Sequence, residues 1–155
     1  MNDNVQYISP QGLKKLQEEL NYRKNDLRKE IAEKISTAKE MGDLSENFEY
    51  QEAKEQQATN EAKIIELENL LRNSIVVDSQ TGGDKIGIGC KFKVLINESE
   101  EKVFEIVGAS ESDPLNGKIS NESPLGQKFL GLAKDDIVEF NSPMGITRYK
   151  ILEIL

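Results

Sequence analysis

The feature that most constrains the fold is a pair of long helix-compatible stretches separated by a short break. Residues 11–41 contain no proline and one glycine, residues 48–73 contain neither, and the hexapeptide GDLSEN lies near the junction. Two helices joined so closely favour an antiparallel hairpin. Its first helix would be about 45 Å long at about 1.5 Å per residue. The pattern therefore predicts a narrow rod that carries two carboxylates, Asp43 and Glu46, at its far end, where they could enter a channel too deep for a globular domain.

The composition favours a rod joined to a small second domain. Charged residues make up 31% of the 155 residues and hydrophobic residues 37%, a balance typical of an elongated element that buries only a seam. We therefore expect a coiled-coil hairpin over residues 1–75 and a second domain over residues 76–155. The net charge of −8 disfavours general adsorption to nucleic acid or to an anionic membrane.

Several classes of protein are disfavoured by what the sequence lacks. A single cysteine, Cys90, and no histidine provide neither a disulfide framework nor a zinc ligand set. The first ten residues show no basic region followed by an apolar run, and no stretch approaches the ~18 apolar residues of a membrane span. We therefore expect a cytoplasmic protein that does not contact a membrane.

The two predicted helices share an apolar seam. Ser9 and Pro10 supply an N-cap and a first helical residue. With Lys24 counted as a seam position, the first helix repeats from Leu16 onward with spacings of 4, 4 and 3 residues, an 11-residue repeat that predicts little supercoiling. Because Gln57 and Asn60 interrupt the seam of the second helix, we expect a stiff base and a more mobile tip. The seam residues are Leu13, Leu16, Leu20, Leu27, Ile31, Ile35 and Ala38 in the first helix, and Ala53, Ile64, Leu67, Leu71 and Ile75 in the second.

Charge is divided between the two helices. Residues 23–39 include six basic and three acidic residues, whereas residues 43–68 include eight acidic and two basic residues. One interpretation is that these charges pair across the hairpin, as flanking charges do in coiled coils. The other is that part of the basic stripe faces a phosphate backbone. The candidates for such a contact are Lys24, Lys39 and Lys54.

The second domain is predicted to be a small antiparallel sheet with one helix packed on it, which makes the fold class α+β. Ser123 and Pro124 begin the helix as N-cap and first helical residue, and a turn is expected at residues 81–84. The expected strands cover residues 90–96, 103–107, 137–140 and 147–155. The expected core residues are Val94, Ile96, Phe104, Ile106, Phe129, Val138 and Ile151.

The two tip acids allow a functional and a structural interpretation. In the functional one they contribute to a divalent-cation site that a partner or a nucleic-acid phosphate completes, since Mg²⁺ usually takes only one or two protein carboxylates. In a two-metal phosphodiester hydrolysis, such a second ion orients and acidifies the attacking water. In the structural one, Gly42 is the C′ residue of the first helix, and Asp43 or Ser45 caps the second, with Glu46 at capping-box spacing.

Apolar residues beside these acids need an explanation of their own. Leu44 lies at an exposed tip and is followed closely by Phe48 and Tyr50. Apolar groups next to acids favour docking against a partner. Alternatively, Phe48 and Tyr50 form a cluster that staples the last turn of the hairpin.

Several segments of the chain resemble one bacterial family. Across the tip, residues 40–57 read EMGDLSENFEYQEAKEQQ, and residues 8–13 read ISPQGL. Residues 119–131 and 149–154 carry further matching motifs. Over essentially the whole chain, the sequence is similar to the bacterial Gre transcript cleavage factors, and to the GreA type in particular.

The resemblance implies both a fold and a function. The coiled-coil hairpin would enter the secondary channel of bacterial RNA polymerase, and a C-terminal domain similar to the FKBP fold would dock at the channel rim. Asp43 and Glu46 would help to hold the second Mg²⁺ of the polymerase active site, with no ion bound tightly by this chain alone. The polymerase, and not this monomeric protein, would hydrolyse backtracked RNA near its 3′ end, and elongation would resume.

Some positions of this chain depart from the family pattern. Lys54 stands where Arg is common, which keeps the charge but loses bidentate geometry. Ser45 stands where Lys is common, and Phe48 replaces a usual small residue. The acidic balance favours the GreA type, which releases short RNA fragments, over GreB-type relatives with a larger basic patch. The residues expected to shape the tip are Gly42, Leu44, Ser45, Asn47, Phe48 and Tyr50, and the candidate RNA contacts are Lys24, Lys39 and Lys54.

Three alternative functions make different demands on the sequence. A Gre-like inhibitor would occupy the channel without promoting cleavage, but such relatives alter the tip acids, and Asp43 and Glu46 are both present. A prolyl isomerase or peptide-binding chaperone needs a deep aromatic-lined cleft, whereas the second domain has few aromatic residues and needs several of them for its core. A purely structural coiled-coil dimer is disfavoured because the short break favours an intramolecular hairpin.

Overall fold

The chain forms two compact units in a computed structural model, which describes residues 5–78 and 83–155. One unit is Leu13–Asn73, and the other joins the described residues up to Gly12 to Ser74–Leu155. This division differs from the boundary expected after residue 75, because a short N-terminal strand pairs with a strand of the second unit.

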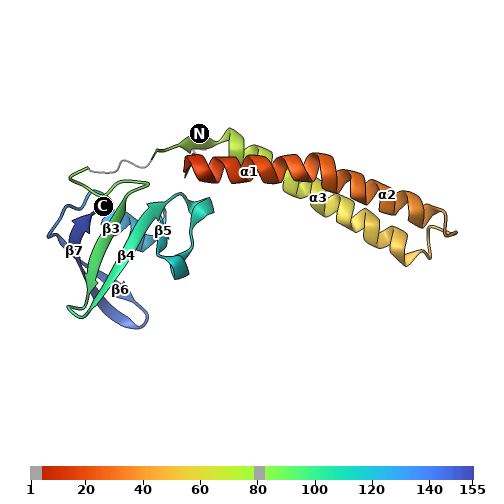
Figure 1. Ribbon diagram of the computed structural model, residues 1–155. Coiled ribbons are helices and arrows are strands. Elements are labelled where there is room, and N and C mark those ends of the chain that lie inside the picture. The colour runs from red at the N-terminus through yellow and green to blue at the C-terminus, as the bar shows by residue number, and fades with distance from the viewer. Residues whose placement is uncertain (1–4, 79–82) are drawn as a thin grey trace. The chain divides into compact units, whose positions relative to one another are not determined.

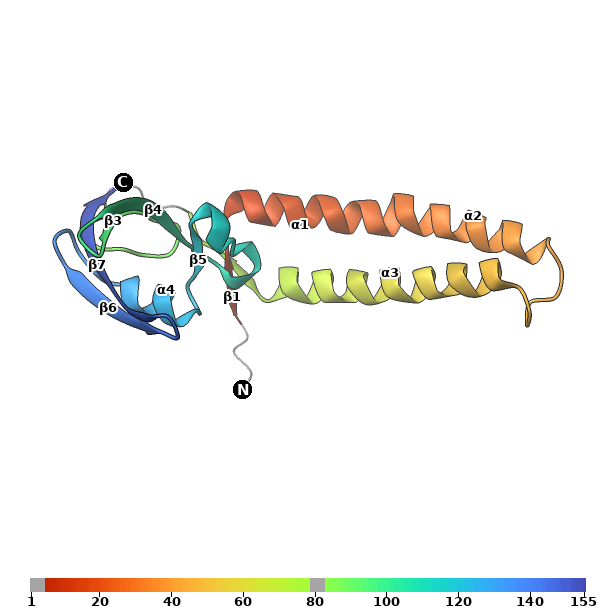
Figure 2. The same cartoon turned by 90° about the horizontal axis from the view of Figure 1, so that it is seen from below.

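The first unit is an antiparallel helical hairpin, as predicted. Its first arm consists of α1 (Pro10–Tyr22), one π-helical turn η1 (Arg23–Leu27) and α2 (Arg28–Lys39), and its second arm is α3 (Phe48–Arg72). The two arms lie side by side in both views (Figure 1, Figure 2). Ser9 caps the first arm as expected, since its Oγ accepts a hydrogen bond from the Gly12 N–H at 2.9 Å.

The seam between the arms is buried at few positions. Ile75, which was expected in the seam, lies instead in β2 (Ser74–Val76), because α3 ends at Arg72. One polar residue, Asn60, is buried among the residues that the structure describes. The buried apolar positions of the seam are Ile31, Ala38, Ala53, Ile64 and Leu67.

The second unit contains a five-stranded sheet, whose strands are labelled in Figure 2. Adjacent strands are antiparallel except for β4 and β5, which are parallel. The four longer strands correspond to the predicted ones, whereas β5 is only three residues long and shows no alternation that a pattern could detect. In spatial order the strands are β5 (Lys118–Ser120), β4 (Glu100–Val107), β3 (Lys91–Ile96), β7 (Gly145–Ile154) and β6 (Ile137–Ser142).

The core of the sheet domain is built around aromatic rings. The predicted helix is α4 (Pro124–Phe129), and Ser123 caps it by accepting a hydrogen bond from the Gly126 N–H at 3.0 Å. The ring of Phe129 is fully buried, with its centroid 5.0 Å from that of Phe92 and 5.3 Å from that of Tyr149. Five expected core residues are buried, and Ile96 and Val138 pack against them; the five are Val94, Phe104, Ile106, Phe129 and Ile151.

A second, two-stranded element joins the N-terminus to this unit. β1 (Gln6–Ile8) pairs in parallel with β2, and the 3₁₀ turns η2 (Ala109–Glu111) and η3 (Pro114–Asn116) follow β4. Gly108 permits the contact with β1, since a Cβ there would lie 1.5 Å from the Tyr7 carbonyl oxygen. Residues 81 and 82 of the turn expected at 81–84 lie outside the described residues.

Candidate functional site

The reversal between the two arms spans residues 40–47. The first arm ends in a turn in which the Met41 N–H donates to the Ala38 carbonyl at 3.1 Å. Gly42 then adopts a φ of 121°, a backbone conformation that residues with a side chain rarely adopt. Gly42 therefore breaks the helix as predicted, although it lies two residues beyond the C-cap residue Glu40 and not one.

Asn47 caps the second arm and ties it to the first. Its Oδ1 accepts a hydrogen bond from the Tyr50 N–H at 3.1 Å, and its Nδ2 donates to the Ala38 carbonyl at 2.6 Å. The structural interpretation, in which Asp43 or Ser45 caps the helix, is therefore wrong. Asn47 directly precedes the first residue of α3, and its amide reaches both arms.

Asn47→Ala is expected to loosen the tip while leaving the rest of the hairpin intact. Loss of an N-cap side chain typically costs about 1 kcal/mol, which should raise amide hydrogen exchange in the first turn of α3 about fivefold. Exchange at the Tyr50 amide, measured by NMR, checks this result. Unchanged exchange at Tyr50 would show that the cap contributes nothing to local stability.

Ser45 orients the carboxylate of Asp43. The Ser45 backbone N–H and hydroxyl both donate to Asp43 Oδ1, at 3.0 and 2.9 Å. These hydrogen bonds, the backbone one foremost, hold the pKa of Asp43 below its usual value. Since both are made to Oδ1, the second oxygen of Asp43 is left without a donor among the described residues.

Ser45→Ala is expected to raise the pKa of Asp43 only part of the way to its usual value. The substitution removes the hydroxyl donor but keeps the backbone N–H, which is the larger cause of the lowered pKa. A carboxylate whose pKa is lowered in the folded state stabilises that state above its unfolded pKa, and the effect is lost as pH falls through the folded pKa. An NMR titration of the Asp43 carboxyl carbon measures the change, and an unaltered pKa would contradict the assigned hydroxyl bond.

The two tip acids carry groups that bind divalent cations in other proteins, but they do not form a metal site by themselves. Asp43 and Glu46 are both exposed, and their carboxylate oxygens are hard ligands of the kind that Mg²⁺ prefers. In the described part of the chain, no three Asp, Glu, Cys or His side chains gather closely enough to hold a metal ion. The remaining ligands of an ion bound here would therefore come from another molecule.

Apolar side chains beside these acids are open to solvent. Met41 is 63% exposed, Leu44 40% and Phe48 75%. Phe48 therefore does not staple the last turn of the hairpin, which removes one of the two interpretations of this residue. Tyr50 is half-buried in the first turn of α3.

Lys24 lies in the part of the basic stripe that pairs across the hairpin. Its Nζ lies 2.5 Å from Glu68 Oε1, and Arg28 makes two hydrogen bonds to Glu61 at 2.7 and 2.8 Å. The hydrogen bonds from Arg28 and Lys24 lower the pKa of Glu61 and Glu68, respectively. Complementary charge between the arms is thus confirmed here, and Lys24 is engaged within the protein.

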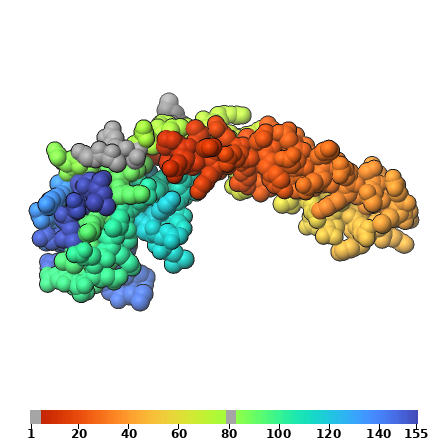
Figure 3. Space-filling model, viewed as in Figure 1, coloured from red at the N-terminus to blue at the C-terminus, as the bar shows by residue number. Residues whose placement is uncertain are grey.

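The other two candidate lysines are closer to the tip and exposed. Lys54 donates a hydrogen bond to Gln57 on the same helix at 2.8 Å. Lys39 makes no hydrogen bond or ion pair with any residue that the structure describes. The side chains of α2 and α3 form an elongated rod that ends at the reversal (orange to yellow in Figure 3).

Two family models match the chain over most of its length. The model "Transcription elongation factor, N-terminal" matches residues 6–76, and the model "Transcription elongation factor, GreA/GreB, C-term" matches residues 80–155. The hairpin and the sheet domain together thus define a two-domain transcription elongation factor. The chain belongs to the GreA/GreB family of these factors, as the motifs at its tip indicated.

Similar proteins share the full length of the chain. It is 48% identical over 157 residues to transcription elongation factor GreA of Clostridium beijerinckii, covering 99% of this chain and 98% of that protein. It is 46% identical to GreA of Clostridium perfringens, covering 99% of each. The crystal structure of GreA factor homolog 1 of Thermus thermophilus is 23% identical, with 98% and 99% coverage and a TM-score of 0.44. The family assignment rests on the sequence matches.

Among the helices of the described residues, none combines the length and the hydropathy that a membrane span needs.

Proposed function

We propose that this protein is a cytoplasmic transcript cleavage factor whose tip enters the secondary channel of bacterial RNA polymerase and stimulates Mg²⁺-dependent cleavage of backtracked RNA. The observation that carries the proposal is the exposed pair Asp43 and Glu46 at the end of a narrow hairpin, in a member of this family. α3 has 25 residues, so it extends about 37 Å at about 1.5 Å per residue. That length is sufficient to carry the acids deep into a channel.

The proposed role of the tip is to complete a metal site that the polymerase holds only in part. Asp43 and Glu46 would supply carboxylate oxygens to the second Mg²⁺, whose chemistry, when bound, is to orient and acidify the attacking water. Ser45 orients the Asp43 carboxylate through its two hydrogen bonds. Asn47 and the positive φ of Gly42 fix the reversal on which both acids are mounted.

The rest of the molecule would position the tip. The C-terminal domain would dock at the channel rim, and the exposed apolar residues Leu44 and Phe48 would contact the channel near the acids. Of the three candidate lysines, Lys39 and Lys54 are available for the RNA 3′ end, whereas Lys24 is paired with Glu68. One monomer per polymerase is sufficient for this arrangement.

A stalled, backtracked elongation complex with labelled RNA tests the proposal. Adding this protein and Mg²⁺ is expected to release short 3′ fragments and to restore elongation when nucleotides are supplied. Slower elongation without fragments would instead indicate an inhibitor that occupies the channel. The absence of any effect on polymerase would contradict both functions.

The isolated protein is expected to have no nuclease activity. Two carboxylates without further ligands leave a divalent cation mostly hydrated, so the chemistry depends on the polymerase. Incubation of the purified protein with labelled RNA and Mg²⁺ checks this expectation. Hydrolysis that survives purification and is lost in Asp43→Asn would show that the protein is itself an enzyme.

A further inference from the structure

Asn60 makes a specific polar contact inside the seam between the two arms. Its side chain is 3% exposed, and it is the only buried polar or charged residue in the described ranges. Its Nδ2 donates to the Arg23 carbonyl at 3.1 Å, and its Oδ1 accepts from Arg23 Nη1 at 3.3 Å. The Arg23 guanidinium is oriented in turn by Glu19, whose Oε1 lies 2.9 Å from Nε. Both ends of the Asn60 amide are thus matched by one residue of the opposite arm.

The partner of Asn60 begins the π-helical turn η1. The Arg28 N–H donates to the Arg23 carbonyl five residues earlier, whereas in an α-helix the donor lies four residues on. The 11-residue apolar repeat did not predict this turn. Among the described turns of the hairpin it is the one π-turn, so the backbone that Asn60 contacts differs in geometry from the α-helical turns on either side of it.

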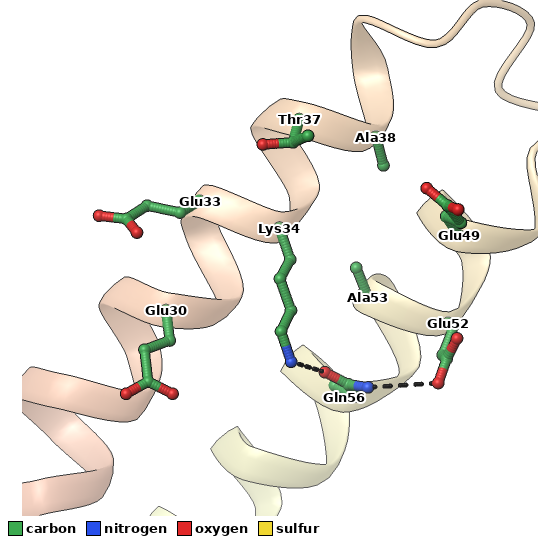
Figure 4. A pocket seen from close by; sticks show the side chains of 9 residues that line it. All are labelled: Glu30, Glu33, Lys34, Thr37, Ala38, Glu49, Glu52, Ala53 and Gln56. Atoms are coloured by element: carbon green, nitrogen blue, oxygen red, sulfur yellow. Dashed lines mark hydrogen bonds between the residues drawn. The ribbon is translucent and has the colours of Figure 1, made fainter.

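Apolar packing specifies the register weakly in the tip half of the hairpin. Beyond Ile31, the buried apolar residues are Ala38 on the first arm and Ala53 on the second. A groove of about 620 Å³ lies between α2 and α3 at this level, and both alanines line it (Figure 4). The Lys34 Nζ crosses the groove to Gln56 Oε1 at 3.2 Å. Small side chains beside an open groove discriminate poorly between neighbouring registers, so the polar contact of Asn60 has the larger effect.

We infer that Asn60 is a positioning residue that fixes the register of the two arms and thereby selects the residues at the tip. A buried Asn in a coiled-coil seam specifies register at a cost in stability. In a hairpin, a slip of one helical turn, about 3.6 residues, moves the reversal by about half that length along the sequence. Asp43 and Glu46 would then leave the apex. The consequence for cleavage rests on the proposed function, whereas the register can be measured without polymerase.

Disulfide trapping in the isolated protein measures the register. On a Cys90→Ala background, Ala38→Cys with Ala53→Cys reports the native register, because these side chains point toward one another across the groove (Figure 4). Ala38→Cys with Gln57→Cys reports a slip of about one turn. Asn60→Leu is expected to speed oxidation of the slipped pair by about tenfold, which corresponds to a loss of about 1.4 kcal/mol of preference for the native register.

Leu is a suitable replacement because it leaves no buried group without a partner. The Arg23 carbonyl keeps the Arg28 N–H, and the guanidinium keeps Glu19. The unfolding temperature of the hairpin is therefore expected to stay the same or to rise, since a seam Asn generally costs stability. Thr59→Leu makes a comparable change at the neighbouring exposed position, and it should alter neither the register nor cleavage.

The functional part of the inference has a rescue test. In the backtracked-complex assay, Asn60→Leu is expected to lower the cleavage rate by about tenfold or more, since misplacement by about 1 Å can cost a hundredfold. Oxidising the Ala38→Cys and Ala53→Cys pair in this variant should restore the rate, because the disulfide returns the native register without the amide.

The outcomes separate the register from the proposed function. If the native pair forms its disulfide in Asn60→Leu as it does in the wild-type seam, and the slipped pair does not, the inference is wrong, whatever the cleavage rate. A second outcome is that the slipped pair is trapped in Asn60→Leu while the Ala38→Cys and Ala53→Cys disulfide, formed in the same variant, fails to restore cleavage. That combination would overturn the link between the register and the placement of the tip. A wild-type protein that stimulates no cleavage would overturn the proposed function, and the trapping result would still decide the register.

Discussion

Asp43→Asn is expected to reduce stimulated RNA cleavage by about 100-fold or more while leaving binding to RNA polymerase intact. Asn has the shape of Asp but no charge, so it is a much poorer ligand for a hard cation such as Mg²⁺. Loss of residues that only support metal ligands already costs about 10–100-fold, and loss of a ligand should cost at least as much. Glu46→Gln is expected to have an effect of the same order. The cleavage rate of backtracked complexes at saturating protein measures both effects.

The control for this prediction is Glu49→Gln, which removes one negative charge from the first turn of α3. Glu49 is exposed and lies outside the reversal, so its loss should change cleavage less than about threefold, within the range of a surface electrostatic effect. Competition for polymerase by each variant confirms that binding is retained. Equal losses of cleavage in Glu49→Gln and Asp43→Asn would indicate general electrostatics and would contradict a ligand role for Asp43.

Phe129→Ala is expected to destabilise the C-terminal domain by about 3–5 kcal/mol, the usual cost of removing a buried phenyl ring. The ring is fully buried and contacts Phe92, Phe104 and Tyr149, so its removal leaves a cavity among side chains that cannot easily close it. Such a loss is comparable to the whole stability of a small domain. Urea unfolding, followed through the NMR signals of β3 and β7, measures the change.

Leu115→Ala is the matched control, because it also shortens an apolar side chain of this unit but at a site that is 98% exposed. Its effect should stay within about 0.5 kcal/mol. Helicity of the hairpin, followed by far-ultraviolet circular dichroism, is expected to change little in Phe129→Ala, because the ring packs within the sheet domain. A Phe129→Ala protein as stable as Leu115→Ala would contradict the assigned core.

The helical hairpin could be predicted because its signals are local. Ser9 and Pro10 begin the first arm, Gly42 breaks it, and the second arm then continues without Gly or Pro to the end of α3. Ser123 and Pro124 marked α4 in the same way. The longer strands show the alternation or apolar runs typical of a sheet with one covered face.

The elements that were missed depend on contacts distant in sequence. β1 and β5 have three residues each, too few for a period, and parallel pairing decides them. The cap of α3 was predicted to be Asp43 or Ser45. The side chains of Asp43, Ser45 and Asn47 can all cap a helix, so their residue types alone do not decide among them. Asn47 is the cap because its amide also reaches the Ala38 carbonyl on the other arm, and no pattern in the reversal itself shows that carbonyl.

The candidate site was predictable in identity and less so in detail. The positions of Asp43 and Glu46 follow from the break between two helices, and their exposure follows from a tip that nothing covers within the hairpin. The hydrogen bond from Ser45 to Asp43 depends on the conformation of the loop, and the ion pair of Lys24 with Glu68 depends on the register of the two arms. The register depends in turn on a π-turn opposite Asn60 that the apolar repeat did not reveal.

The Mg²⁺ dependence of cleavage tests the central claim most directly. Backtracked complexes are titrated with Mg²⁺ in three samples: without added protein, with the wild-type protein, and with Asp43→Asn. Each protein is present at a concentration that saturates polymerase. If the tip supplies ligands to the second ion, the wild-type protein should lower the Mg²⁺ concentration needed for half-maximal cleavage, and Asp43→Asn should not. An equal lowering by both proteins would contradict the claim that these carboxylates hold the ion.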